Sequence, residues 1–305
     1  MAEKRKFETE AIRGQIERTQ YREHSVPMYP SSSFVFDSAE QGRALFAGEE
    51  EGLVYSRYGN PNTGEFVNKL AALEGLPAGI ATASGMAAVF LSIAAFVERG
   101  DHIVASRSLF GSTHQLFSQL FPKWGVTASY VDATDTKGFE EAVQENTRML
   151  FAESPSNPGL DIVDLDALGE IARKHSLIFN VDNCFATPYL QRPAELGAHV
   201  VTHSATKFID GQGRVLGGAV LGSEELIEKA MFLSRHTGPA LSPFNAWLLS
   251  KSLETLAVRM EEHCRNAQAL AQRLTENPNI NWVKYPFLDS HPQHELARRQ
   301  MKLGG

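Results

Sequence analysis

From Thr63 onward the chain alternates short apolar runs with longer stretches of helical periodicity. The short runs are rich in Val, Ile and Leu, which predicts buried strands near residues 80–83, 102–105, 126–131, 149–152, 177–181, 200–202 and 216–221. Helices fit between most of them, near residues 63–73, 85–97, 112–121, 139–144 and 165–174. The succession of strand, helix and strand predicts an α/β fold with a mostly parallel seven-stranded sheet covered on both faces.

The regions on either side of this alternating pattern differ from it. Residues 1–60 are polar and rich in turn formers, with a brief helical pattern near 39–47, and predict an extended arm. An arm that cannot bury itself is expected to contact a neighbouring subunit. After Gly222 we expect helices at 224–234 and 244–275, a strand near 280–285 and a helix at 294–301. The predicted organisation is an arm (1–60), a large domain (61–255) and the start of a second α/β domain (256–305).

Composition and charge narrow the class of protein. A second domain ordinarily needs on the order of 100 residues, and fewer follow residue 255 of this 305-residue chain, so we expect that domain to be incomplete. The formal net charge of −7 argues against a nucleic acid or an anionic membrane as partner. Two cysteines and ten histidines show no disulfide framework or metal-ligand spacing, so no metal site is predicted. No secretory or membrane-spanning segment is found, and a cytoplasmic location is expected.

The stretch Val200–Ile209 carries the strongest chemical signal. An apolar β-branched run ends in Ser204, Thr206 and Lys207, as when a buried strand presents polar side chains at its end. A half-apolar setting favours the neutral amine of a lysine, which can attack an aldehyde. Most lysines are solvent-exposed surface residues, so only the residues that accompany Lys207 support it as a candidate reactive group.

Other polar or aromatic groups follow the predicted strands. Asp182 ends one strand, Gly85 opens a helix after another, and Phe110 and Asn157 lie in turns that follow two more. Ligands bind parallel sheets at these strand ends, although each motif alone is also ordinary turn or loop chemistry. The glycines at 211, 213, 217 and 218 do not form a dinucleotide fingerprint, because they precede a strand and open no helix.

The segments Val181-Asp182-Asn183 and Ser204-Ala205-Thr206-Lys207 resemble those of the Cys/Met-metabolism family of pyridoxal-phosphate (PLP) enzymes, and matching motifs run from about Tyr55 to the last residue. The resemblance implies the fold type I architecture of PLP-dependent transferases, with PLP as cofactor. It also implies that relatives continue past Gly305 and carry the arginine for the substrate carboxylate there.

The resemblance assigns roles to particular residues. Lys207 would bind the cofactor aldehyde, Asp182 would pair with its ring nitrogen, and Phe110 would stack on its ring. Many relatives have tyrosine at that position, and Phe110 cannot transfer a proton. The predicted catalytic residues are Lys207, Asp182 and Phe110, and the predicted cofactor-binding residues are Tyr55, Arg57, Gly85, Met86, Phe110, Asn157, Asp182, Ser204, Thr206 and Lys207.

The implied reaction is a γ-replacement that converts a homoserine ester, the O-succinyl ester being expected, and sulfide to homocysteine. The acetyl ester, or cysteine as the nucleophile, remains an alternative, because all share the same chemistry. Ser112 stands where methionine γ-lyases are expected to have cysteine. Tyr55 and Arg57 are implied to bind the phosphate of a neighbouring subunit, so at least a homodimer, and commonly a tetramer, is expected. The alternative of another class is a PLP-binding or structural α/β protein without activity.

Overall fold

Seven strands form one sheet in the order β1-β7-β6-β5-β4-β2-β3 in the computed structural model, which describes residues 5–14 and 18–305. Residues 1–4 and 15–17, which belong to the predicted arm, lie outside the described residues. The strands are β1 (Ala78–Thr82), β2 (His102–Ser106), β3 (Thr127–Val131), β4 (Thr147–Glu153), β5 (Ile178–Asp182), β6 (Val200–Ser204) and β7 (Gly218–Gly222). The predicted seven-stranded sheet is therefore confirmed.

All strands except β7 run in the same direction. The pairs β6–β5, β5–β4, β4–β2 and β2–β3 are parallel, whereas β7 is antiparallel to both of its neighbours, β1 and β6. The carboxyl ends of the six parallel strands consequently meet at one edge of the sheet, where open α/β sheets bind their ligands.

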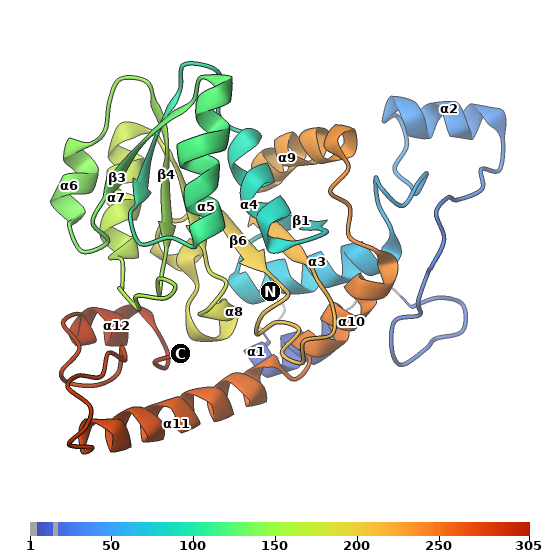
Figure 1. Ribbon diagram of the computed structural model, residues 1–305. Helices are drawn as coiled ribbons and strands as arrows, with labels where there is room; N and C mark the ends of the chain where they lie inside the picture. The colour runs from blue at the N-terminus through green and yellow to red at the C-terminus, as the bar shows by residue number, and fades with distance from the viewer. Residues whose placement is uncertain (1–4, 15–17) are drawn as a thin grey trace.

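Helices cover both faces of the sheet (Figure 1). The helices before β5 are α1 (Phe7–Arg13), α2 (Ala39–Ala47), α3 (Pro61–Glu74), α4 (Gly85–Ala94), α5 (Gly111–Gln115), η1 (Leu116–Leu120), η2 (Phe121–Trp124), α6 (Thr136–Glu141) and α7 (Leu165–His175). The later ones are α8 (Thr187–Leu190), η3 (Pro193–Leu196), α9 (Glu224–Thr237), α10 (Pro243–Leu253), α11 (Leu256–Thr275) and α12 (His294–Gln300).

The core forms two layers, one on each side of the sheet. On one face the side chains of Leu150, Phe179 and Val201 pack with α3 and α7. On the other face those of Ile103 and Met149 pack with α4, η1 and η2, and Val200 and Val220 pack with α4 and α9. Because both faces are covered, the five inner strands β2, β4, β5, β6 and β7 are almost wholly buried, which explains their continuous apolar runs in the sequence.

Two predictions beyond the sheet are wrong. The helix expected over residues 244–275 is interrupted at Glu254 and Thr255, which separate α10 from α11. The expected strand near 280–285 does not form, and Trp282 is mostly exposed there. A strand needs a partner for its ladder of hydrogen bonds, and none lies beside this segment in the described part of the chain.

The start of the predicted arm packs against its own chain. Ala11 of α1 is buried in the core, and the ring of Phe7 meets that of Tyr189 edge-on at 5.1 Å. Helix α2, by contrast, lies apart from the sheet in Figure 1. The arm thus has one end anchored on the large domain and a more distant segment around α2.

The segment after α11 returns to the turn that follows β4. Gln293 and Gln300 donate hydrogen bonds to the carbonyl oxygens of Ile162 and Val163, both at 2.9 Å, and Ala297 is buried with Ile162. Among the described helices, none has the length and apolar character that crossing a membrane requires.

Candidate active site

A cavity of about 480 Å³ lies at the carboxyl edge of the sheet. Eight of the predicted site residues line it, together with Ser84, Val89, Ser112, Glu153, Cys184, Phe185 and Leu216; the eight are Gly85, Met86, Phe110, Asn157, Asp182, Ser204, Thr206 and Lys207. The parallel strands bring these residues together, although they are up to 122 positions apart in sequence (Gly85 to Lys207).

Lys207 lies three residues beyond the end of β6, in a tight turn, and its side chain reaches the cavity. The carbonyl oxygen of Lys207 accepts a hydrogen bond from the N–H of Gly211 at 2.8 Å, which closes the turn. The hydroxyl of Thr206 contacts both the N–H and the carbonyl of Gly217 at 3.2 Å. The turn is thereby tied to the segment that leads into β7, and the backbone that carries the amine is fixed.

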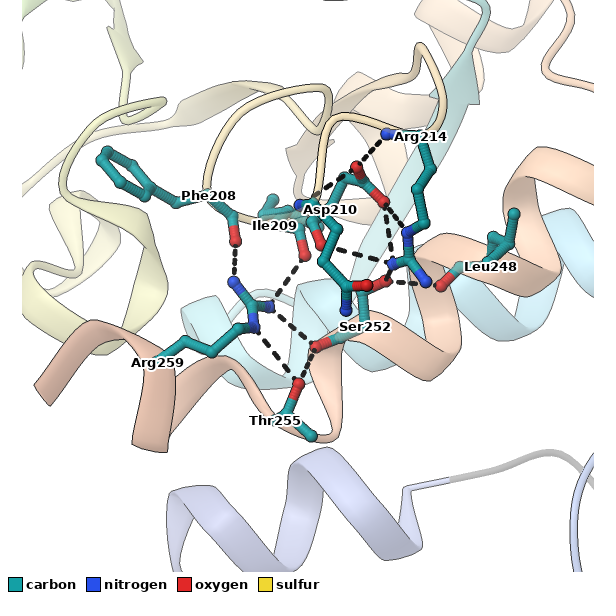
Figure 2. Close-up of polar contacts among 9 residues, drawn as sticks. Phe208, Ile209, Asp210, Arg214, Leu248, Ser252, Thr255 and Arg259 are labelled. Carbon is teal, nitrogen blue, oxygen red and sulfur yellow. Dashed lines mark hydrogen bonds and ion pairs between the residues drawn. The ribbon is translucent and has the colours of Figure 1, made fainter. Parts of the chain in front are cut away.

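Two arginines anchor the same turn from outside the cavity (Figure 2). Arg259 of α11 donates to the carbonyl oxygens of Phe208 and Ile209, at 2.5 and 3.0 Å, and to that of Ser252 at 2.9 Å. Arg214 pairs with the buried carboxylate of Asp210 at 2.9 Å. These charged groups hold in place the backbone immediately after Lys207.

Gly211 is required by this arrangement. Its φ of +69° is a left-handed conformation, and a Cβ there would lie 2.0 Å from the guanidinium of Arg259. The glycines at 211, 213 and 217 therefore belong to a turn behind Lys207 that leads into β7, as expected from the position of these glycines before a strand.

The amino end of α4 provides a place for an anion. The hydroxyl of Ser84 caps the helix by accepting the N–H of Ala87 at 3.2 Å. The N–H groups of Gly85 and Met86 belong to the first helical turn, where no intrahelical acceptor exists, and the helix dipole favours negative charge. A Cβ on Gly85 would lie 2.4 Å from that of Ser204, so only glycine lets the helix approach β6 this closely.

Asp182 ends β5 inside the cavity and is 9% exposed. Burial raises the pKa of its carboxyl, and the N–H of Cys184, which donates to it at 3.0 Å, opposes that shift. A buried carboxylate of this kind gains free energy from a cationic partner within the cavity. A protonated pyridine nitrogen is such a partner, so the residues present fit the predicted cofactor.

Glu153 is a site residue that the sequence analysis did not assign. It ends β4 as Asp182 ends β5, is only 3% exposed, and pairs with Asp182 in the register of the two strands. Burial, with the neighbouring Asp182 adding to it, raises the pKa of Glu153 to about 8. The signal was available, because an acid at the end of an apolar strand is the same pattern that singled out Asp182.

Phe110 and Asn157 lie in the turns after β2 and β4. The ring of Phe110 is 43% exposed and lines the cavity, which suits an aromatic ring that stacks on a ligand. Asn157 is followed by Pro158, and their peptide bond is cis. The N–H groups of both Phe110 and Asn157 donate to the carboxylate of Glu153, at 2.7 and 3.0 Å.

Tyr55 and Arg57 do not line this cavity. Arg57 lines a separate hollow with Asn60 and Ser234, donates to the carbonyl oxygen of Arg235, and lies over the ring of Tyr58 at 4.8 Å. Both Tyr55 and Arg57 are exposed. These two predicted residues are therefore not brought together with the other eight within one chain.

Comparison with known proteins relates this site to a described class. The family model of Cys/Met metabolism PLP-dependent enzymes matches residues 8–305. The chain is 49% identical over 294 residues to the O-succinylhomoserine sulfhydrylase of Pseudomonas aeruginosa, covering 96% of this chain and 73% of that protein. It is 43% identical over 302 residues to the L-methionine gamma-lyase of Porphyromonas gingivalis, and the match covers 98% of this chain and 76% of that protein.

Solved structures agree with the sequence comparisons. The metB protein of Corynebacterium glutamicum superposes with a TM-score of 0.93 at 38% identity, covering 99% of this chain and 77% of the other. A candidate O-acetylhomoserine (thiol)-lyase of Campylobacter jejuni, solved with a pyridoxyl-lysine monophosphate, gives a TM-score of 0.93 at 33% identity, with coverages of 97% and 82%.

The fold and the cavity define an enzyme of the α/β class built around a lysine and a buried aspartate. The chain belongs to the Cys/Met metabolism PLP-dependent enzyme family. The predicted family and the predicted cofactor, pyridoxal phosphate, are confirmed by this membership.

Proposed function

We propose that this enzyme converts O-succinylhomoserine and sulfide to homocysteine and succinate, a step of methionine biosynthesis. The observation that carries the proposal is the convergence of Lys207, Asp182 and the amino end of α4 on one cavity. The relatives named O-succinylhomoserine sulfhydrylase, at 48 and 49% identity, support the choice of ester and nucleophile.

In this proposal each part of the cavity holds one part of the cofactor. Lys207 binds the aldehyde, and Asp182 pairs with the ring nitrogen. The phosphate is bound by the amino end of α4 together with the hydroxyls of Ser204 and Thr206. Once bound, pyridoxal phosphate supplies an electron sink for the α-carbon of the substrate.

The amine of Lys207 then acts as the proton carrier. It carries a proton away from the α-carbon and then one away from the β-carbon, and the second loss allows the C–O bond at the γ-carbon to break, with succinate leaving as the carboxylate. Sulfide forms the new C–S bond at the γ-carbon, and protons return to the β- and α-carbons. The carboxylate of Asp182 stays ionised throughout and stabilises positive charge beside it.

Methionine γ-lyase activity is the second candidate, because relatives of that name are 41 to 43% identical. Ser112, where the family resemblance expects cysteine in such lyases, lines the cavity and favours the replacement reaction. A competition assay distinguishes the activities: the enzyme receives O-succinyl- or O-acetylhomoserine with sulfide or cysteine, and separately methionine alone. Homocysteine formed from sulfide and the succinyl ester supports the proposal. Exclusive use of cysteine, or faster cleavage of methionine, refutes it.

We further propose that the enzyme works as at least a dimer, and as a tetramer if it follows its relatives, with Tyr55 and Arg57 completing the phosphate site of the neighbouring subunit. Their exposed positions away from the cavity of their own chain support this role. Arg57→Ala and Lys207→Ala should each be inactive, and after mixed refolding about a quarter of wild-type activity should return, because half of the molecules are hybrids with one intact site. No recovery would contradict a shared site.

The proposed organisation into an arm at 1–60, a cofactor domain at 61–255 and a further domain beginning at 256 follows from the same reasoning. A cytoplasmic location is proposed with it, since Cys184 and Cys264 are both free and buried. Limited proteolysis tests the organisation, and cell fractionation tests the location.

A further inference from the structure

Glu153 holds two loops of the cavity at once. Its Oε2 accepts the N–H of Phe110 at 2.7 Å, and its Oε1 accepts the N–H of Asn157 at 3.0 Å. Phe110 begins the turn into α5, and Asn157 lies in the turn after β4. One carboxylate thus connects backbone segments 43 and 4 residues away from it.

The two oxygens of the Glu153 side chain divide these contacts between them. Both of its oxygens accept hydrogen bonds, whereas the amide of glutamine has one accepting oxygen and one donating nitrogen. In Glu153→Gln, one of the two N–H groups would therefore face another donor. An apolar side chain would leave both N–H groups without this acceptor.

Keeping a carboxylate here is costly. Glu153 is almost fully buried, Asp182 lies beside it on the neighbouring strand, and both carboxyls have raised pKa values. The other titratable groups of the cavity are Lys207 and the thiol of Cys184, whose pKa burial also raises. Strand pairing alone would be served by an apolar residue at the end of β4, so the cost of burying this acid points to a use of its two oxygens within the cavity.

We propose that Glu153 is a positioning residue that fixes the placement of Phe110 relative to Asn157 across the cofactor cavity. This inference rests on the proposed function for the identity of the bound group. The ring of Phe110 and the side-chain amide of Asn157 are then already positioned before the cofactor binds. Because their loops need not rearrange on binding, the free-energy cost of binding is lower.

The test compares Glu153→Gln and Glu153→Asp with Glu65→Gln. Glu65 is also a buried glutamate, but it lies on α3, pairs with Lys69 and does not line the cavity. For each purified apoprotein, pyridoxal phosphate is titrated in and the dissociation constant is measured. The visible absorbance of the loaded protein is then followed against pH, and kcat and KM are measured separately.

Glu153→Gln should bind the cofactor about tenfold more weakly, corresponding to about 1.4 kcal/mol. It should also shift the pH midpoint of the absorbance and lower kcat about tenfold, with KM changed less than twofold. Glu153→Asp keeps two accepting oxygens and should recover part of each effect. Glu65→Gln should match the wild type in dissociation constant and pH midpoint.

Two results would overturn the proposal. One is a Glu153→Gln protein with the dissociation constant and pH midpoint of the wild type; the other is a crystal structure of Glu153→Gln in which Phe110 and Asn157 have not moved. If Glu153→Gln does not fold by circular dichroism, the decision rests on Glu153→Asp, for which unchanged cofactor binding refutes the role. Cofactor binding needs no substrate, so a wild type that binds pyridoxal phosphate but lacks sulfhydrylase activity would refute the proposed function alone.

Discussion

Replacing Arg259 by methionine should weaken both the fold and the attachment of the cofactor. The guanidinium bonds to the carbonyl oxygens of Phe208, Ile209 and Ser252 and to the hydroxyl of Thr255 at 3.2 Å (Figure 2). Methionine keeps the length and apolar volume of the side chain but has no donor. The variant therefore tests the polar contacts with little change in packing.

The magnitude follows from these contacts. A hydrogen bond from a charged donor contributes about 1.5–3 kcal/mol net, and a buried carbonyl left without a partner costs about 1–3 kcal/mol. Arg259 is partly exposed, so water can replace some of the lost contacts. We expect the free energy of unfolding to fall by about 2–4 kcal/mol. Because Phe208 directly follows Lys207, cofactor affinity should fall as well.

Urea denaturation of the apoprotein measures the first effect, and titration with pyridoxal phosphate measures the second. Arg265→Met is the matched control, since Arg265 lies on the same helix, with a side chain 73% exposed, and pairs only with Glu262 among the described residues. An exposed pair contributes about 0–1 kcal/mol. Equal stability losses in the two variants would refute the estimate, and a destabilised Arg259→Met with wild-type cofactor affinity would refute the link to Lys207.

Three further predictions concern the cavity itself. Lys207→Arg should keep the fold and the positive charge but lose the visible absorbance of the cofactor-loaded enzyme and nearly all turnover. Circular dichroism measures the fold, and absorbance spectroscopy measures the bound cofactor. Retained visible absorbance would contradict the role of Lys207. Gly85→Val should weaken cofactor binding at least tenfold, because its Cβ would lie 2.4 Å from that of Ser204, and calorimetric titration measures the loss. The third prediction concerns pH. The folded pKa values of Glu153, about 8, and Asp182, about 6, lie above the unfolded ones, 4.5 and 3.8, so the native apoprotein holds more protons between these values. The two carboxyls contribute fully to the free energy of unfolding below pH 4, and this contribution is lost as the pH rises through 6 and 8. The free energy of unfolding falls by about 1.4 kcal/mol per pH unit for each fully titrating group. Urea denaturation at pH 5 and pH 8 should show a smaller loss in Glu153→Gln than in the wild type, and parallel pH dependences would count against the assignment.

The sheet could be predicted because its inner strands are buried on both faces and form continuous apolar runs in the sequence. The cavity followed from the same pattern, since polar residues placed after parallel strands must meet at one edge. Asp182 and Lys207 were found in this way, and Glu153 would have been found by the same rule applied to β4.

Other features depend on contacts that a local pattern does not contain. The break at Glu254 and Thr255 occurs within a stretch of uniform helical periodicity, where Arg259 binds both the end of α10 and the turn after Lys207. The expected strand near 280–285 has suitable residues but no partner in the described part of the chain. Helix α1 is buried through Ala11 and Phe7, and a few apolar positions in a polar region gave little sign of it.

The placement of β7 has a consequence for how the molecule is built during synthesis. Among the strands of the described chain β1 has β7 as its one neighbour, apart from an isolated bridge between Thr82 and Ala240, and Ala78 lies opposite Gly222. We therefore expect the first strand made to join the sheet only when the last one is available. Until about 140 further residues have emerged (from Thr82 to Gly222), we expect α4 to lack its contacts with β7, and the half of the cavity that Gly85 and Ser204 form to be incomplete. A nascent chain arrested before residue 222 should therefore contain most of the parallel strands and yet fail to retain a phosphate-bearing ligand.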